Sequence, residues 1–516
     1  MNVLSIMDKQ KVVVLWFKRD LRITDHRPAA MAIAHGLPVL CLYVYEPDLL
    51  QHPDSDIRHW RFAHQSIGQL NQYLQTFHQR VLEWYGNVLD VLEYIQRHFS
   101  IEAIYSHEEI GVGISFERDK AVAKWCHHHG AKWIESPTNG IIRGLKSRKS
   151  WQTKWYDTMR AEIVHPDWIH IRPAPITLLN NKDFELPPEF KAAVARHEPL
   201  FQFGGFLHAR EVLASFLHNR IWQYSSSISK PHESRDGCSR LSAHLAWGNL
   251  SIREVYQAAV SAAGQYPPKS RQIQFFITRL FWHCHFIQKF ESHSTMEFEN
   301  VNKGYDLIRN DRNEFYIEAW RNGQTGYPLV DASMECLRQT GYINFRMRAM
   351  LVSFLTHNLW QHWETGVHHL ASLFLDYEPG IHYPQFQMQA GTMGVHTIRT
   401  YNPVKQAKEK DPSAVFIKTW LPQLAALPLP FVHEPWEMSM QEQKKYGVLL
   451  GVDYPEPIID YKMSAAEASR RLWEMKRQKQ VKANNAEVLE KLSLRKSDAE
   501  HPIKRQKSIV LNFKLF

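Results

Sequence analysis

The sequence predicts a doubly wound parallel-sheet α/β domain, of Rossmann-like type, followed by a large all-α domain. Short apolar runs alternate with amphipathic segments over residues 1–135, and long helical patterns follow over residues 204–462. A proline-rich linker, residues 136–203, separates the two patterns, and a basic tail, residues 463–516, ends the chain. Alternating strands and helices are typical of a parallel sheet with right-handed crossovers.

The α/β prediction depends first on a continuous apolar run, VVVLWF, which is typical of a strand buried on both faces. No GxGxxG follows this run, so ordinary dinucleotide binding at the first strand is not expected. The expected strands are residues 12–17, 37–45, 80–84, 103–105 and 131–135, with helices near 59–76, 88–98 and 116–128.

The second half of the chain has helical periodicity, interrupted by Gly/Pro turns such as TGYP at residues 325–328. The expected helices are residues 209–224, 241–263, 270–290, 315–322, 332–340 and 346–366.

Composition excludes several classes of protein. The 516 residues include 44% hydrophobic residues and 17 Trp, which excludes a mostly disordered chain. No apolar run of about 18 residues and no secretory signal are found, so we expect a cytoplasmic protein without membrane contact, and a monomer. The 5 Cys are widely spaced, which argues against a disulfide scaffold or a Cys-based metal centre, and no metal is predicted.

The net charge of +9 is concentrated in the tail. Residues 463–516 contain 13 Lys and Arg against 6 Asp and Glu, a net charge of +7. Such a tail is compatible with a polyanionic partner, but also with an ordinary solvated helix, here expected over residues 465–482.

Three motifs contain candidate functional residues. WFKRDLR, residues 16–22, follows the first strand, where ligands of open α/β sheets gather. GCSRLS, residues 237–242, offers amide and hydroxyl donors to a phosphate at a helix start, although a plain N-cap explains it equally. In YINFRMR, residues 342–348, Arg346 and Arg348 point in different directions on a helix, so one can face a buried acid and the other a polyanion.

These motifs occur together and in the order found in one family. The order is WFKRDLR, CSRLS, WxxGxTGYPxVDA (residues 320–332), TGYINFRMR (340–348), SFL (353–355), YNP (401–403) and HEPW (433–436). The chain resembles the cryptochrome/photolyase flavoproteins over residues 11–462. The resemblance implies an α/β antenna domain and a helical domain that holds FAD, with a possible antenna chromophore, deazaflavin or folate, near Glu108 and Glu109.

The resemblance also implies residue roles. The FAD contacts it implies are Tyr224, Cys238, Ser239, Arg240, Leu241, Ser242, Phe276, Arg279, Trp282, His283, Tyr342, Phe345, Arg348, Asp376, Glu378, Ile381 and His382. Arg348 and Asp376 match an ion pair over the flavin, and Asp376 and Glu378 match two carboxylates beside it, in a segment read as a loop. The implied DNA contacts are Arg346, Arg399 and Trp282, and the implied catalytic residues are Trp282, His382, Arg279, Trp363 and Trp360.

The chain departs from the family pattern at several of these positions. Phe345 replaces an Asn, Arg279 replaces the lesion-binding Glu, and Ala349 replaces a Met beside the dimer. His382 replaces the Asn that faces flavin N5, where a histidine can donate a proton or hold charge. The chain of three Trp residues that supplies electrons to the flavin is also broken, because Phe386 and Asn310 stand at two of its positions and only Trp363 remains. We therefore expect photoreduction of the flavin to be slow, or to follow another route through Trp360, Trp363 or tyrosines.

Three functions follow as hypotheses. The first is light-driven repair of UV-damaged DNA by a deoxyribodipyrimidine photolyase, a lyase that cleaves carbon–carbon bonds in a flipped-out pyrimidine dimer, with a cyclobutane dimer favoured over a (6-4) lesion. The second is a cryptochrome-type blue-light photoreceptor, for which the basic tail is a candidate output element. The third is a helical DNA-binding protein without a cofactor, whose purified form would be colourless.

Overall fold

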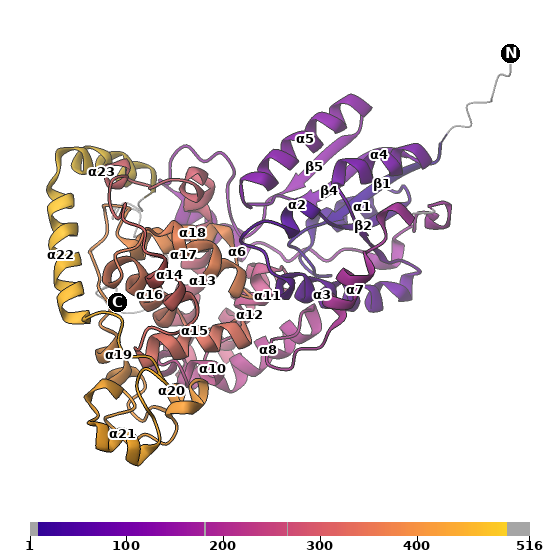
Figure 1. Cartoon of the computed structure of the whole chain (residues 1–516). Coiled ribbons are helices and arrows are strands. Elements are labelled where there is room, and N and C mark those ends of the chain that lie inside the picture. The colour runs from indigo at the N-terminus through magenta and orange to yellow at the C-terminus, as the bar shows by residue number, and fades with distance from the viewer. Residues whose placement is uncertain (1–8, 180–181, 266, 493–516) are drawn as a thin grey trace.

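The computed structural model describes residues 9–179, 182–265 and 267–492, which form an α/β domain, a connecting segment and a helical domain (Figure 1). The sheet contains the five expected strands, all parallel: β1 (Lys11–Phe17), β2 (Val39–Tyr45), β3 (Val81–Tyr85), β4 (Ser100–His107) and β5 (Lys132–Ser136). Their order is β3-β2-β1-β4-β5. The direction of winding reverses at β1, so the loops after β1 and β4 diverge and leave a crevice between them.

Both faces of this sheet are covered, which explains the continuous apolar run of β1. Val13, Leu15 and Phe17 lie in one buried core, and Val12, Val14 and Trp16 lie in another. The first core is closed by α1 (Arg27–Ala34) and α3 (Ile57–Leu74), and the second by α4 (Val88–His98) and α5 (Gly113–His129). The first of these helices, α1, and the short α2 (Pro47–Leu50) were not among the expected elements.

The segment that connects the domains contains two helices. They are α6 (Trp151–Arg160), which buries Trp151 and Trp155 against the helical domain, and α7 (Pro188–Ala195), which packs on α3. Pro173 also forms an isolated bridge with Val39 of β2, so part of this segment lies along the sheet.

The rest of the described chain is helical, as expected. Its helices up to residue 446 are α8 (Phe206–His218), α9 (Tyr224–Ser227), α10 (Ser234–Gly237), α11 (Ser242–Ala246), α12 (Ile252–Gln265), α13 (Ser270–Glu291), α14 (Glu314–Arg321), α15 (Pro328–Thr340), α16 (Phe345–Ser353), α17 (Glu364–Leu373), α18 (Pro379–Ala390), α19 (Pro403–Lys410), α20 (Val415–Trp420) and α21 (Met440–Tyr446). Short 3₁₀ segments join several of them.

Several expected elements differ from the structure. The helix expected over 209–224 is α8 and α9, separated by the 3₁₀ turn Arg220–Gln223, and the tail helix expected over 465–482 ends at Arg477. The single helix expected over 241–263 is two, α11 and α12, because Gly248 adopts a φ of +67° and a Cβ there would lie 2.3 Å from the Arg19 carbonyl oxygen. The helix expected over 346–366 is divided by a π-helical turn, Phe354–Asn358, after α16. The expected proline-broken loop around His382 is the helix α18, which begins at Pro379 and continues through Pro384.

The basic tail begins as two packed helices at the edge of the helical domain, α22 (Tyr461–Arg477) and α23 (Lys479–Leu492) (Figure 1). Leu472 and Val481 are fully buried and share a small core with Tyr305 and Ile308. Residues 493–516 of the tail lie outside the described residues. In the described part of the chain, every helix is too short or too polar to cross a membrane.

Candidate functional site

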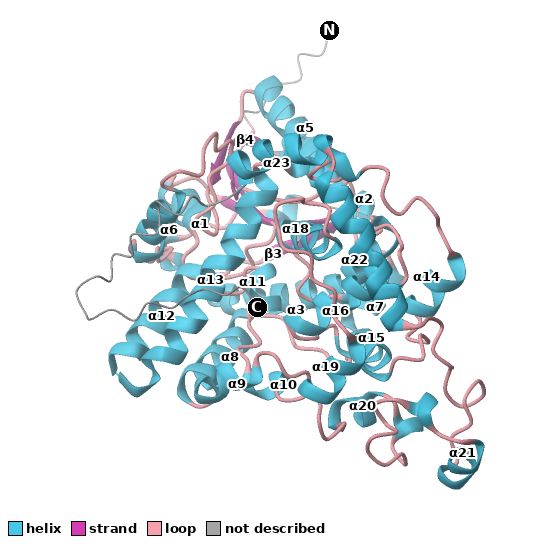
Figure 2. Ribbon diagram, turned by 90° about the vertical axis from the view of Figure 1, so that its left-hand side faces the viewer, coloured by secondary structure: helices cyan, strands magenta, loops and turns pink. Residues whose placement is uncertain are grey.

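Some of the predicted FAD contacts lie together in the interior of the helical domain, where Figure 2 shows α11, α13, α16 and α18 grouped near the centre of the molecule. We call this group of residues the central chamber. It comprises Tyr224, Cys238 to Ser242, His283, Tyr342, Arg348 and Asp376. Their coupling is visible in direct contacts: Arg240 lies 3.8 Å from the ring centroid of Tyr342, and Arg348 lies 5.9 Å from the same ring.

The turn over Cys238 to Ser242 forms one wall of the chamber and is rich in donors. Arg220 donates to the carbonyl oxygens of Cys238 and Ser239, and Arg240 adopts a φ of +58°, which is uncommon outside glycine. Burial raises the pKa of Cys238 to about 12, so its sulfur remains a thiol and only a weak donor. Two cationic side chains, Arg220 and Arg240, therefore lie at this turn.

Arg348 and Asp376 form the ion pair that the resemblance implies. The guanidinium donates to both carboxylate oxygens, at 2.9 and 2.8 Å, in a bidentate arrangement. Burial alone would raise the pKa of Asp376, but Arg348 and the Ser242 hydroxyl hold that pKa below its ordinary value. Asp376 thus stays ionised and fixes the Arg348 guanidinium, which also lies 3.9 Å from the Phe374 ring centroid.

His382 lies on α18 and is hydrogen-bonded within the helical domain. Its Nε2 lies 2.8 Å from the Val367 carbonyl oxygen, so Nε2 carries the proton and donates it there. Burial lowers the pKa of His382 to about 4. At neutral pH the ring is therefore uncharged, with its Nε2 proton directed at Val367 and an acceptor at Nδ1.

Trp282 and His283 of α13 belong to the same region. The Trp282 ring lies 4.9 Å from the His285 ring, and Trp282 is partly exposed. Burial lowers the pKa of His283 to about 4, so it is neutral. On the same helix Arg279 is exposed and lies 4.7 Å from the Phe275 ring centroid.

Other predicted residues lie farther from this ion pair. Phe276 is buried behind Tyr224, and Ile381 is half-buried at the edge of the core. Trp363 is buried and donates to Asn300, whereas Trp360 packs near α22 with Arg309 and Arg471 over its ring. Phe345 is 43% exposed at the start of α16.

Glu378 does not join Asp376, although only one residue separates them. Its carboxylate lies 3.9 Å from Arg19 of the α/β domain and lines a cavity between the two domains. Burial raises the pKa of Glu378 to about 7. Glu378 therefore faces the cavity between the domains, whereas Asp376 is paired with Arg348 inside the helical domain.

The cavity between the domains continues along the ends of β1, β2 and β4. It is lined by Trp16, Lys18, Glu109, Arg118 and Trp247, among other residues. Arg118 donates to Glu46 and Glu109 at 2.6 Å each and lies 5.0 Å from the Trp16 ring centroid. Aromatic rings next to paired charges make this cavity a second candidate ligand site, close to Glu109 as predicted.

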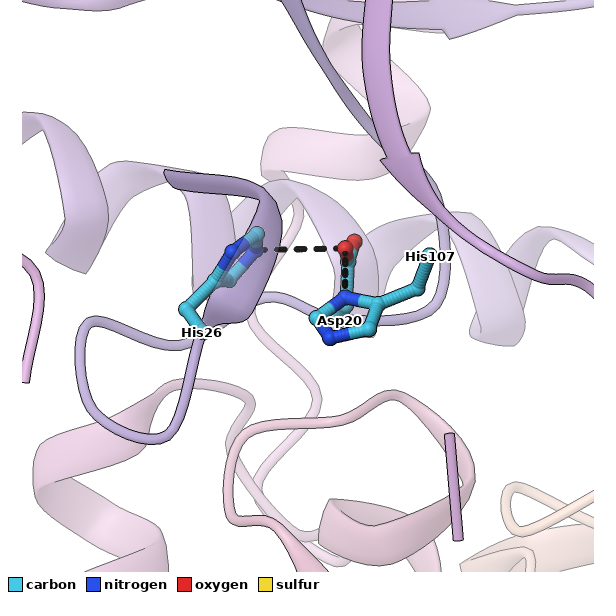
Figure 3. A group of neighbouring side chains, drawn as sticks. All are labelled: Asp20, His26 and His107. Atoms are coloured by element: carbon cyan, nitrogen blue, oxygen red, sulfur yellow. Dashed lines mark hydrogen bonds and ion pairs between the residues drawn. The ribbon is translucent and has the colours of Figure 1, made fainter. Parts of the chain in front are cut away.

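Asp20, His26 and His107 lie beside this cavity and resemble a metal-ligand group (Figure 3). His26 Nδ1 accepts a hydrogen bond from the Ala29 amide, so His26 Nε2 carries the proton and points at Asp20 Oδ2, 3.1 Å away. His107 Nδ1 donates to the same oxygen at 2.7 Å. Both imidazoles thus direct protons at the carboxylate, an arrangement that holds the loop after β1 and opposes metal ligation.

Sequence reasoning did not identify several residues that shape the chamber. Gln202 accepts from Arg240, Arg220 holds the Cys238 turn, and Arg235 donates to the Tyr342 carbonyl oxygen. They stand outside the quoted motifs, so no signal in the sequence pointed to them. Asn344 was detectable, because its side chain accepts from the Met347 amide as an ordinary N-cap of α16.

The chamber fits the flavin dinucleotide that the resemblance implies. The buried atoms Nε2 of His283 and Nε of Arg240 have no hydrogen-bond partner within the described chain, and such atoms are costly unless a ligand satisfies them. In the described chain, Arg220, Arg235 and Arg240 have no carboxylate within salt-bridge distance, which suits a diphosphate.

Comparisons with known proteins agree with this picture. Residues 13–161 match a family model described as DNA photolyase, and residues 276–474 match one described as the FAD binding domain of DNA photolyase. A cryptochrome DASH from Synechocystis sp. is 30% identical, covering 90% of this chain and 98% of that protein. A deoxyribodipyrimidine photo-lyase from Alkalihalophilus pseudofirmus is 26% identical, covering 88% of this chain and 96% of that protein.

The crystal structure of a Synechocystis cryptochrome superposes with a TM-score of 0.80 at 25% identity, covering 90% of this chain and 100% of that one. A class III photolyase from Agrobacterium tumefaciens gives 0.78 at 22%, covering 92% and 100%.

Proposed function

We propose that this chain, which belongs to the cryptochrome/photolyase family of flavoproteins, uses light to split pyrimidine dimers in UV-damaged DNA, with a cyclobutane dimer as its substrate. The main support for the proposal is that two arginines of α16 point in different directions. Arg348 points inward to Asp376, whereas Arg346 donates to Gln406 in a partly exposed position. One helix thus serves a cofactor chamber and a surface that can meet a phosphate backbone.

The chain's own residues would prepare the chamber for this reaction. FAD, when bound, supplies the light-absorbing redox group. Arg348, fixed by Asp376, holds a positive charge in the chamber, while His382 and His283 are neutral and add polarity alone. Trp282 offers a partly exposed aromatic face on which an extruded base can stack.

The proposal is tested by incubating the reduced holoprotein with an oligonucleotide that contains one defined cyclobutane dimer, under blue light and in the dark. Light-dependent loss of the dimer is expected, and a (6-4) lesion in a parallel reaction establishes the lesion class. Dimers that persist equally in light and dark would exclude repair. Lys444→Gln, an exposed change on α21, should repair like the wild type.

A specific observation also favours a second candidate, a blue-light photoreceptor. Arg279, which stands where the family has a lesion-binding Glu, is exposed and lies over Phe275, and Phe345 is 43% exposed. These departures weaken the expected lesion contacts, and several similar proteins are named cryptochromes. A holoprotein that shows flavin photochemistry but neither binds nor repairs damaged DNA would support this candidate.

We further propose that the cavity between the domains accepts an antenna chromophore, a deazaflavin or a folate. Its support is the placement of Trp16 and Trp247 beside the Glu109–Arg118 pair at the ends of the strands. A fluorescence excitation spectrum of the purified protein should contain a band that is absent from FAD. A spectrum of FAD alone would count against this antenna.

A further inference from the structure

A second group of basic side chains lies beside Trp282, apart from the central chamber. We call it the basic cluster and define it as Arg148, His285, Lys289, His396 and Lys476. Its members come from the loop before α6, from α13, from the loop after α18 and from α22. Arg148, His285 and Lys289 are only 3, 4 and 4% exposed, whereas His396 and Lys476 are partly exposed and form the rim.

Direct contacts hold the cluster together. The Arg148 guanidinium donates to His285 Nδ1 at 2.9 Å, so Nδ1 of this imidazole is an acceptor and carries no proton. Lys476 Nζ donates to the His396 carbonyl oxygen at 3.3 Å. His396 is also close enough to Lys289, Arg399 and Lys476 to be influenced by their charges.

Lys289 is the residue that makes this cluster unusual. Within the described residues no carboxylate lies within salt-bridge distance of the Lys289 Nζ atom. This atom lies 5.3 Å from the centroid of the Phe286 ring, and the positive charge of Arg148 is close enough to act on it. Burial, with a smaller contribution from Arg148, lowers the pKa of Lys289 to about 7. Buried ammonium groups are normally paired, because an unpaired one destabilises the fold.

The position of the basic cluster next to Trp282 indicates which anion would pair with it. The imidazole of His285 lies 4.9 Å from the ring of Trp282, the aromatic side chain proposed to stack an extruded base. His396 shares its loop with Arg399, an expected DNA contact. A nucleotide stacked at Trp282 would therefore bring its strand's phosphates toward the rim formed by His396 and Lys476.

We propose that the basic cluster is an anion site that receives a backbone phosphate of the DNA strand next to the extruded nucleotide, with Lys289 and Arg148 as its cations. This inference rests on the proposed function in DNA repair. It assigns Lys289 as a DNA-binding residue, a role that none of the motifs in the sequence suggested. The charge of Lys289, which has no carboxylate within salt-bridge distance in the described residues, becomes paired when the phosphate binds.

The first experiment measures DNA affinity as a function of salt. Fluorescence anisotropy with a labelled oligonucleotide that contains one dimer compares the wild type with Lys289→Met and with the exposed control Lys444→Gln. Loss of one phosphate contact should weaken the Lys289→Met complex roughly 3- to 10-fold and reduce the slope of log K against log salt by about 0.9. An unchanged slope for Lys289→Met would overturn the proposal.

The second experiment uses Lys289→Arg, which keeps the charge at every pH. Wild-type affinity should fall as pH rises from about 6 to about 8.5, because free Lys289 loses its proton while the bound phosphate requires it. The Lys289→Arg complex should show a flatter profile. Within the described chain, three titratable groups face Lys289. Burial lowers the pKa values of His285 and His396, which are neutral over this range, and it lowers the pKa of Arg148 to about 10, so Arg148 stays charged. Equal profiles for the two proteins would contradict the proposal.

Thermal unfolding separates a binding role from a structural one. Lys289→Met removes an unpaired buried charge, so its melting temperature should equal or exceed that of the wild type while DNA binding weakens. A lower melting temperature together with unchanged binding would assign Lys289 to the fold instead.

Two further arms identify the source of the phosphate and separate this inference from the proposed function. Inorganic phosphate should bind weakly to the wild type and compete there with DNA, but it should not do so in Lys289→Met. Tight binding of inorganic phosphate without competition would identify a site for free anions and overturn the assignment to DNA. If the wild type binds neither damaged nor undamaged DNA, the proposed function itself fails. If the wild type binds DNA and Lys289→Met binds equally well, only the present inference fails.

Discussion

Charge states in the helical domain are set by the immediate surroundings of each residue. Arg348 keeps Asp376 ionised, whereas burial keeps His382 and His283 neutral. The family resemblance implied the Arg348–Asp376 pair, which joins residues 28 positions apart. It did not imply that Glu378 faces the cavity between the domains or that His382 donates to Val367. Both depend on the helical backbone of α18, where the prolines of the sequence favoured a loop.

The first prediction concerns the buried pair. Asp376→Asn leaves the Arg348 guanidinium without its counter-charge, so the free energy of unfolding should fall by about 3 kcal/mol and flavin should be retained less well. Urea unfolding and the ratio of flavin to protein absorbance provide the measurement. Glu318→Gln breaks an exposed pair with Arg321 on α14 and should cost less than about 1 kcal/mol. Equal losses in the two variants would contradict the argument.

At the scale of elements, periodicity located most helices and strands but not their interruptions. Gly248 divides α11 from α12 because Arg19 approaches it, a contact between residues more than two hundred positions apart. Pro384 lies inside α18 although proline usually ends a helix. The tail helix α22 buries Leu472, so the expected solvated tail is in part a component of the core. Long-range packing decided each case, and local sequence carries no record of it.

Packing of the tail helix leads to a second prediction. Leu472→Ala should create a cavity beside Tyr305 and Val481 and lower stability by about 3 kcal/mol, detectable as a reduced melting temperature. Trp473→Ala, on the exposed side of the same helix, should change stability by less than about 1 kcal/mol. For the same reason, deletion of residues 463–516 removes part of the fold and is a poor test of signalling. An unchanged melting temperature in Leu472→Ala would show that the packing of α22 does not contribute to stability.

The N-terminus of α5 provides a third prediction, on pH. Glu297 of the helical domain accepts from the Gly113 amide at 2.8 Å, and burial raises the pKa of Glu297 from 4.5 to about 7. Between these values the folded state holds a proton that the unfolded state releases, so this carboxyl costs stability as pH rises from about 4.5 to about 7. Glu297→Gln keeps an acceptor oxygen, and it should match the wild type near pH 4 and exceed it by up to about 3 kcal/mol at pH 8. Urea unfolding across pH measures this, and a difference that does not vary with pH would refute it.

At the scale of the whole molecule, Asp54 joins the two domains. It comes from the α/β domain and accepts hydrogen bonds from three side chains of the helical domain: His368 at 2.6 Å, Tyr383 at 2.8 Å and Tyr377. The sequence predicted two domains and their order, but not this contact, since Asp54 stands in an unremarkable loop segment, HPDSD. Arg19 of the WFKRDLR motif also contacts the helical domain, so the orientation of the domains depends on residues both inside and outside the quoted motifs.

The fourth prediction follows from this contact. Asp54→Ala leaves the three donors without their acceptor, so stability should fall by about 3 kcal/mol and the segment between the domains should be cleaved faster in limited proteolysis. Asp48→Ala, an exposed change nearby on α2, should leave both unchanged. Cleavage at the wild-type rate in Asp54→Ala would show that other contacts suffice.

Trp360 lies between two guanidinium groups, with Arg309 4.9 Å and Arg471 5.1 Å from its ring centroid. A positive hole left on this indole by loss of an electron would be repelled, by about 3 kcal/mol from Arg309 alone at an effective dielectric constant of about 20. Arg471 is partly compensated by Glu467, but Arg309 has no carboxylate partner within the described chain. Oxidation of Trp360 should therefore be less favourable than oxidation of Trp363, and we expect an oxidised tryptophan to remain at Trp363 rather than at Trp360.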